Sequence, residues 1–293
     1  MLDKNFLTPM TLREIHARGD FLTHEKLWIA FHNSPTVDYR HTDYLFSSGR
    51  WRGYEWRDVR ETPSLASTLV LGHSDKEVTL PMVEDVLSHT QYRFIYASNV
   101  SSEAAKLVTV HDLPLGIPNR ERQSKTHIIQ GDQTLVTRAW KKAQRRALVT
   151  KPTIYANFSS RTNPSVRNKV LDIVAPLSHV KKGSFQLSKK GRALDLETMA
   201  QSGIVLCPRG NGMDTHRVWE ALLVGAVPAL LATDHSARLL RELALPHISL
   251  TSWEEVRDYP DITARYLDCI KEKWDFSGLS ASWWVSRIEA HIS

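Results

Sequence analysis

The sequence predicts an α/β protein made of two Rossmann-like, doubly wound domains that face each other. The chain has 293 residues, which is more than one ordinary domain of about 100–200 residues needs. Apolar segments of strand length alternate with segments of helical spacing, a pattern typical of parallel sheets buried on both faces. The series restarts after Lys151-Pro152. We therefore expect an N-terminal domain over residues 1–150 and a C-terminal domain over residues 151–293.

In the N-terminal half, four apolar segments have the length and composition of strands. They cover residues 26–31, 67–72, 92–97 and 107–111. A helix is predicted over 81–88, because its apolar residues recur at helical spacing, and the basic stretch 139–147 also has helical character.

The C-terminal half repeats this alternation. Strands are predicted over residues 153–158, 204–207, 227–231 and 247–250, with helices over 168–174, 216–224 and 239–243. Regular alternation of this kind predicts a second doubly wound domain.

The composition excludes several classes of protein. Hydrophobic residues make up 42% and charged residues 24% of the chain, as in folded globular proteins. No run of about 18 uncharged apolar residues occurs, so we expect no transmembrane segment, and the N-terminal residues do not resemble a secretory signal. The only cysteines are Cys207 and Cys269, which predicts a reducing compartment without disulfides. We expect a cytoplasmic protein.

The net charge of +6 is concentrated in two segments, residues 120–151 and 181–192. Clusters of lysine and arginine can bind nucleic acid, anionic lipid or acidic glycan, and they can also be ordinary solvated surface. Charge alone leaves the partner open.

The most informative segment is Gly203–Pro228. An apolar strand leads into a loop that contains Gly210 and Gly212, and a helix begins near Asp214 or Thr215. Either of these polar residues could cap the helix. Glycines allow close approach of a ligand to the backbone, and a helix N-terminus attracts anions. The segment therefore predicts an anion-binding site.

Charged side chains support this interpretation. Arg209 and Arg217 add positive charge in a geometry suited to phosphate. Glu220 lies one turn after Arg217, so its carboxylate could accept hydrogen bonds from ribose hydroxyls while Arg217 meets a diphosphate. The alternative that stays open is a simple helical ion pair between Arg217 and Glu220, with glycines that only form a turn.

Two other phosphate-binding motifs do not fit. The Walker motif requires Gly-Lys-Ser/Thr at the end of the loop, which is absent. The dinucleotide fingerprint requires a third glycine where this chain has Thr215. An NTPase or an NAD-dependent enzyme is therefore less favoured.

The segment resembles the nucleotide-sugar-binding motif of exostosin-like glycosyltransferases. The matching elements are Cys207-Pro-Arg-Gly, Arg217-Val-Trp-Glu-Ala and Gly225-Ala-Val-Pro. Weaker similarity begins at Leu71, Leu113, Tyr155 and Leu245, so that the likeness spans roughly residues 67–257. The chain is shorter than the animal exostosins, and their heparan substrate is not carried over.

The resemblance implies a GT-B arrangement, with the donor on the C-terminal domain and the acceptor facing the N-terminal domain. By this analogy Arg217 holds the diphosphate and Glu220 the ribose. Basic side chains usually neutralise the leaving diphosphate in such enzymes, so no metal and no cofactor are expected. The sequence agrees, since it has neither Asp-x-Asp nor the His/Cys spacing of a metal site.

The candidate site residues fall into two groups. The candidate donor-binding residues are Arg209, Gly210, Asn211, Gly212, Asp214, Thr215, His216, Arg217 and Glu220, joined by Asn157, Arg161 and Arg167 after the first strand of the second domain. For the catalytic base that deprotonates the acceptor, Asp75 is preferred, with His73 beside it as the alternative, since ligands bind at the carboxyl ends of such strands.

The functional prediction is transfer of a sugar from a nucleoside-diphosphate sugar to an acceptor hydroxyl. The acceptor is either a glycan or a hydroxylated base in DNA. One alternative is a nucleic-acid-binding protein without enzymatic activity that uses the basic segments 120–151 and 181–192. Another is an epimerase of similar shape, which would consume the donor without an acceptor.

Overall fold

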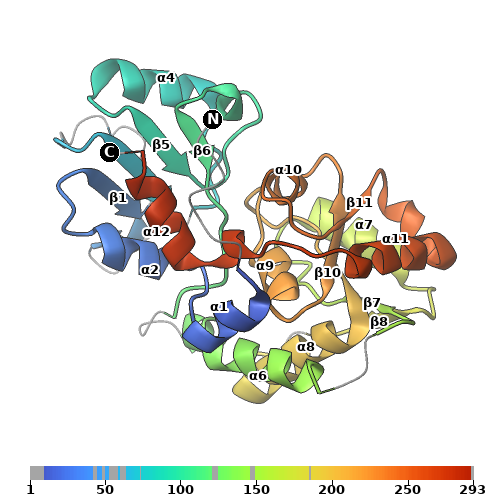
Figure 1. Cartoon of the computed structure of the whole chain (residues 1–293). Helices are drawn as coiled ribbons and strands as arrows, with labels where there is room; N and C mark the ends of the chain where they lie inside the picture. Colours follow the sequence, from blue (N-terminus) through green and yellow to red (C-terminus); the bar gives the residue numbers. More distant parts are fainter. Residues whose placement is uncertain are drawn as a thin grey trace. The chain divides into compact units, whose positions relative to one another are not determined.

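The computed structural model describes residues 10–41, 45–47, 50–52, 59, 64–72, 74–120, 125–145, 149–184 and 186–291. These residues form two compact units, each with a parallel sheet flanked by helices (Figure 1). Unit 1 contains the described residues of 1–21, 116–211 and 215–280, and unit 2 those of 22–115, 212–214 and 281–293. The α/β fold is confirmed, and the GT-B arrangement stays a prediction.

Unit 1 is built on a five-stranded sheet whose strands are all parallel. Its strands are β7 (Thr153–Ala156), β8 (Val180–Lys182), β9 (Gly203–Leu206), β10 (Val227–Leu231) and β11 (Ile248–Leu250). The spatial order is β11-β10-β9-β7-β8. Chain progression therefore reverses between β7 and β9, and open α/β sheets bind ligands at the carboxyl ends of the strands at such a point.

Helices cover both faces of this sheet. The first face carries α7 (Pro164–Val174), η3 (Trp253–Arg257) and α11 (Tyr259–Lys271), which share one apolar core with Ile154 and Ala156 of β7. Tyr155 points the opposite way, to α8 (Lys189–Ser202), which contacts α9 (His216–Leu223). The remaining helices of unit 1 are α1 (Leu12–Arg18), α5 (Lys125–Gln130), α6 (Gln133–Ala143), α10 (His235–Glu242) and η4 (Ser277–Leu279).

Residues 116–150 do not belong with the N-terminal sheet, which differs from the predicted boundary at residue 150. The main reason is α6, whose buried face of Val136, Ala139 and Trp140 packs on α8 of unit 1. The chain therefore leaves unit 2 after Leu115, well before the start of β7.

Unit 2 contains a four-stranded parallel sheet in the order β1-β4-β5-β6. Its strands are β1 (Val37–His41), β4 (Thr68–Gly72), β5 (Phe94–Ala97) and β6 (Val110–Asp112), with η2 (Ala104–Lys106) before the last and a separate antiparallel pair β2 (Leu45–Ser47) and β3 (Arg50–Arg52). Helix α4 (Leu80–His89) packs on the face of Leu69 and Ile95. Helix α12 (Ala281–Glu289) lies on the opposite face, where the hydroxyl of Tyr96 meets the Arg287 carbonyl.

The strand predicted over residues 26–31 is wrong, because this segment is helix α2 (His24–Phe31). The hydroxyl of Thr23 caps the helix by accepting a bond from the Lys26 N–H at 3.2 Å. Only one helical face is buried, through Leu27 and Phe31, while Ile29 is 56% exposed. A continuous apolar run in the sequence is therefore part of an amphipathic helix. Strand β1, which we did not predict, forms the edge of the sheet.

The other predicted strands agree with the structure to within a few residues, except that the strand predicted over 107–111 is β6, residues 110–112. Among the described residues, no helix combines the length and the apolar character that a membrane crossing requires.

Candidate functional site

The candidate site lies in unit 1 at the carboxyl ends of β7 and β9, where the strand order reverses. The loop after β7 covers residues 157–163, and the glycine-rich loop after β9 covers residues 207–215. Helix α9 follows the second loop and carries Arg217 and Glu220. The site predicted from the segment Gly203–Pro228 thus coincides with the position at which this topology binds ligands.

Arg167 of α7 holds the two loops together. Its Nε donates to the carbonyl of Arg209 at 3.1 Å, its Nη2 to that of Pro208 at 3.2 Å, and its Nη1 to that of Ser159 at 3.1 Å. Burial, together with the smaller effect of the nearby Arg217 guanidinium, lowers the pKa of Arg167 to about 10. Because the guanidinium contacts backbone carbonyls of both loops, Arg167 fixes the conformation of the loops after β7 and β9.

Asn163 makes a second connection between these loops. It adopts the left-handed conformation with φ 51°, and its Nδ2 donates to the Gly210 carbonyl at 3.1 Å. A Cβ at Gly210 would lie 3.3 Å from Nη2 of Arg167. Close packing on Arg167 is thus a structural reason for glycine at this position.

Asp195 of α8 is the centre of a buried polar network beside the loops. Its Oδ1 accepts from the Tyr155 hydroxyl at 2.9 Å and from Nδ2 of Asn157 at 2.8 Å. Its Oδ2 lies 3.7 Å from Nη2 of Arg217 and 3.6 Å from Nη1 of Arg192. Asn157, a predicted donor-binding residue, is therefore engaged with Asp195.

Arg217 has unused hydrogen-bonding capacity. Its side chain is 15% exposed, and among the described residues its buried Nη1 has no hydrogen-bond partner. Burial on its own lowers the pKa of Arg217, but the carboxylates of Asp195 and Glu220 more than offset this effect, so that the pKa is raised. Arg217 is thus a permanent cation with free N–H groups beside Arg167.

Glu220 is buried, at 3% exposure, and is paired with Arg192. Nη2 of Arg192 donates to Oε1 of Glu220 at 2.5 Å. The two residues of α9 therefore pair with different partners on α8, Glu220 with Arg192 and Arg217 with Asp195. The alternative of a helical ion pair between Arg217 and Glu220 is not what the structure shows.

Sequence reasoning missed both members of α8 that complete the network, Arg192 and Asp195. Arg192 was included in the basic segment 181–192, yet its side chain is only 2% exposed. An Arg-x-x-Asp spacing places both groups on one helical face, which is the signal that was present. It was not specific, because such pairs are common on solvated helices.

The remaining candidate residues differ in their exposure and in their contacts. Arg209 and Asn211 are exposed, as is Arg161 in the loop after β7. Thr215 is the N-cap of α9, and its side chain makes no capping hydrogen bond. Nδ1 of His216 is 2.8 Å from the Gly116 carbonyl.

Gly212 and Asp214 belong to unit 2 by their packing. Oδ2 of Asp214 accepts from the Leu115 N–H at 2.8 Å, and the Asp214 N–H donates to Oδ1 of Asn99 at 2.8 Å. A Cβ at Gly212 would lie 3.0 Å from Oδ1 of Asp75. Close packing within unit 2 thus favours a glycine at this position.

Asp75, the preferred catalytic base, is exposed and follows β4 of unit 2. Its loop is held by Asn99, whose Nδ2 donates to the Ser74 carbonyl. His73, the alternative base, lies outside the described residues. Among the residues that are described, no group of three or more His, Cys, Asp and Glu could hold a metal ion.

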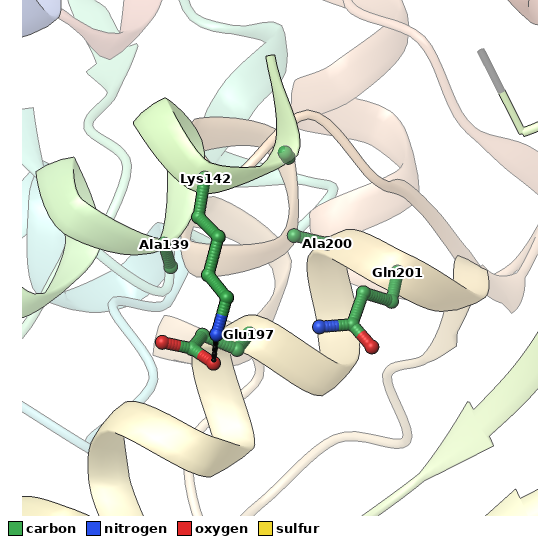
Figure 2. Close-up of a pocket in the computed structure, with 6 residues that line it drawn as sticks. Ala139, Lys142, Glu197, Ala200 and Gln201 are labelled. Carbon is green, nitrogen blue, oxygen red and sulfur yellow. Dashed lines mark hydrogen bonds and ion pairs between the residues drawn. The ribbon is translucent and has the colours of Figure 1, made fainter. Parts of the chain in front are cut away.

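The two basic segments contribute to packing within unit 1. Figure 2 shows Lys142 of α6 reaching Glu197 of α8 across a small recess whose lining includes Ala139 and Ala200. Lys189 lies 3.8 Å from Asp132. Neighbouring carboxylates therefore compensate part of the positive charge of the two basic segments.

Comparison with known families agrees with this geometry. Residues 136–265 match the family model described as the RXYLT1 C-terminal domain. This match supports the resemblance to exostosin-like glycosyltransferases. The matched region includes all five strands of the unit 1 sheet together with Arg167, Arg192 and Arg217. Its match indicates a glycosyltransferase-like function. No curated protein matched the chain.

Proposed function

We propose that the chain is a glycosyltransferase that binds a nucleoside-diphosphate sugar at the carboxyl end of the unit 1 sheet and transfers the sugar to an acceptor hydroxyl. The observation that carries this proposal is the partly buried guanidinium of Arg217. Its pKa is raised, and its Nη1 has no hydrogen-bond partner among the described residues. A guanidinium in this state is a strong donor for a diphosphate oxygen.

The local charges support an anionic ligand. Arg167 and Arg217 are close enough for Arg217 to depress the pKa of Arg167, so a diphosphate between or beside them would relieve their repulsion. The network of Arg192, Arg217, Asp195 and Glu220 sums to zero formal charge, and therefore does not itself neutralise Arg167.

The sugar would reach the acceptor by displacement of the nucleoside diphosphate. The oxygen of the acceptor hydroxyl forms a bond to the anomeric carbon while the bond from that carbon to the diphosphate oxygen breaks. Arg217 stabilises the charge that develops on the leaving diphosphate, and Asp75 is the proposed acceptor of the hydroxyl proton. The protein itself supplies these groups, and the proposal includes no metal or cofactor.

Binding of nucleoside diphosphates tests the donor site directly. Thermal unfolding is measured with UDP, GDP, ADP and CDP for the wild type and for Arg217→Ala. A ligand at about 100 times its Kd stabilises the fold by about 2.7 kcal/mol, which raises the Tm by several degrees. We expect one nucleotide to shift the wild type and not the variant.

Arg257→Ala is the matched control, because Arg257 is an exposed arginine of the same unit whose ion-pair partner among the described residues is Glu254 of the surface helix η3. It should keep the full ligand shift. Donor turnover with and without a glycan or hydroxylated-DNA acceptor then separates a transferase from an epimerase. A well-folded wild type that no nucleotide stabilises, and that binds duplex DNA equally with Arg217→Ala, would refute the proposal.

A further inference from the structure

Glu220 would bind a ribose only if its carboxylate is held in place, and the structure shows one group that does this. Arg192 lies on α8, and its side chain is 2% exposed. Its Nη2 donates to Oε1 of Glu220 at 2.5 Å and to the Gln130 carbonyl at 3.3 Å. These bonds connect α9 to α8 and to the end of α5.

The burial of Arg192 excludes a direct role in binding a ligand. Its two terminal nitrogens are directed to protein carboxylates, Nη2 to Glu220 and Nη1 to Asp195 at 3.6 Å, and its buried Nε has no hydrogen-bond partner among the described residues. Its effect on a ligand must therefore pass through these two residues. Asp195 in turn contacts Arg217 at 3.7 Å, a contact that does not involve the Arg192–Glu220 pair.

Glu220 keeps one oxygen available. Only Oε1 accepts a hydrogen bond from a described residue. A carboxylate accepts at both oxygens, so Oε2 is left as an acceptor for hydroxyl groups while the charge-assisted bond from Arg192 fixes Oε1.

We infer that Arg192 is a positioning residue that makes the proposed donor site selective for ribose by holding Glu220 as an oriented carboxylate. This inference rests on the proposed function. It assigns to Arg192 a role in recognising the 2′- and 3′-hydroxyls of a nucleoside diphosphate, and it leaves binding of the diphosphate to Arg217.

The test compares the affinity of the wild type for a ribonucleoside diphosphate and for its 2′,3′-dideoxy counterpart by calorimetry. We expect the wild type to prefer the ribonucleotide by roughly ten- to hundredfold, the range for hydrogen bonds to a charged group. Arg192→Met should reduce the preference to about twofold or less while binding of the dideoxynucleotide changes little. Glu220→Gln should reduce the preference as well.

Controls separate positioning from general damage. Lys190→Met removes a positive charge from an exposed position of the same helix and should leave the preference unchanged. Arg192→Lys keeps the positive charge but lacks the branched guanidinium group, and it should keep part of the preference that Arg192→Met loses. If Arg192→Met does not fold, Arg192→Leu, which also removes all the donors of Arg192, decides the question in the same way.

Different binding results would refute the proposed function and the role of Arg192. If the wild type binds neither form of any nucleotide, the proposed function itself fails. If the wild type binds both forms equally well, or if a folded Arg192→Met or Arg192→Leu protein keeps the wild-type preference, the donor site stands and the role of Arg192 is overturned.

Discussion

Lowering the pH should destabilise unit 1 through His16, a buried histidine of α1. Its side chain is 5% exposed. Nε2 lies 2.7 Å from the Leu223 carbonyl and Nδ1 lies 3.3 Å from the Thr137 hydroxyl. A neutral imidazole satisfies both contacts by donating from Nε2 and accepting at Nδ1. The ring also stacks on Trp140 with 4.3 Å between centroids.

Burial lowers the pKa of His16 from 6.5 to about 4, despite the opposing hydrogen bond to Leu223. Because the folded pKa lies below the unfolded one, the unfolded chain binds the proton more readily. The contribution of His16 to stability is therefore complete above pH 6.5 and declines as the pH falls toward 4. At 1.36 kcal/mol per pKa unit, the full loss is about 3.4 kcal/mol, of which about 2 kcal/mol is lost between pH 7.5 and pH 5.

The measurement is urea unfolding of the wild type and of His16→Gln at pH 7.5, 6 and 5. Glutamine can still donate to the Leu223 carbonyl but does not titrate in this range. Burial also lowers the pKa of His111 to about 4, so the wild type has a second source of acid sensitivity, and the difference between the two proteins isolates His16. A wild type that loses no more stability than His16→Gln between pH 7.5 and 5 would refute this reasoning.

Three further predictions address the fold and the site. Leu27→Ala should cost about 2–5 kcal/mol of stability, while Ile29→Ala, on the exposed face of the same helix, should cost less than about 0.5 kcal/mol; equal costs in urea unfolding would contradict the helical assignment. Asp75→Asn should lower kcat by about 10²–10⁴-fold and leave nucleotide binding intact, and retention of full transfer activity would exclude Asp75 as the base. Arg167→Lys keeps the charge but loses the hydrogen bonds to three loop carbonyls, so it should lower the free energy of unfolding by about 1.5–3 kcal/mol and weaken nucleotide binding. A variant as stable as the wild type would show that these hydrogen bonds are unimportant.

Local sequence signals were sufficient for most of the unit 1 sheet. Strands β7, β9, β10 and β11 are short apolar segments between turns, and they remain strands because both faces of the sheet are covered. The glycine-rich loop and the start of α9 were also predictable, since a strand, two glycines and a helical stripe follow each other directly in the chain. Such features depend on neighbours within a few residues.

Tertiary packing decided what each charged residue contacts. The sequence placed Arg192 in a basic segment and Arg217 next to Glu220, yet the structure pairs Glu220 with Arg192 and Arg217 with Asp195. Likewise the apolar run 26–31 is compatible with a strand or a helix, and the one-sided burial of Leu27 and Phe31 selects the helix. The amino-acid sequence determines which groups carry charge or apolar surface. Their partners depend on which helices pack side by side, because residues distant in the chain then bury each other's charges.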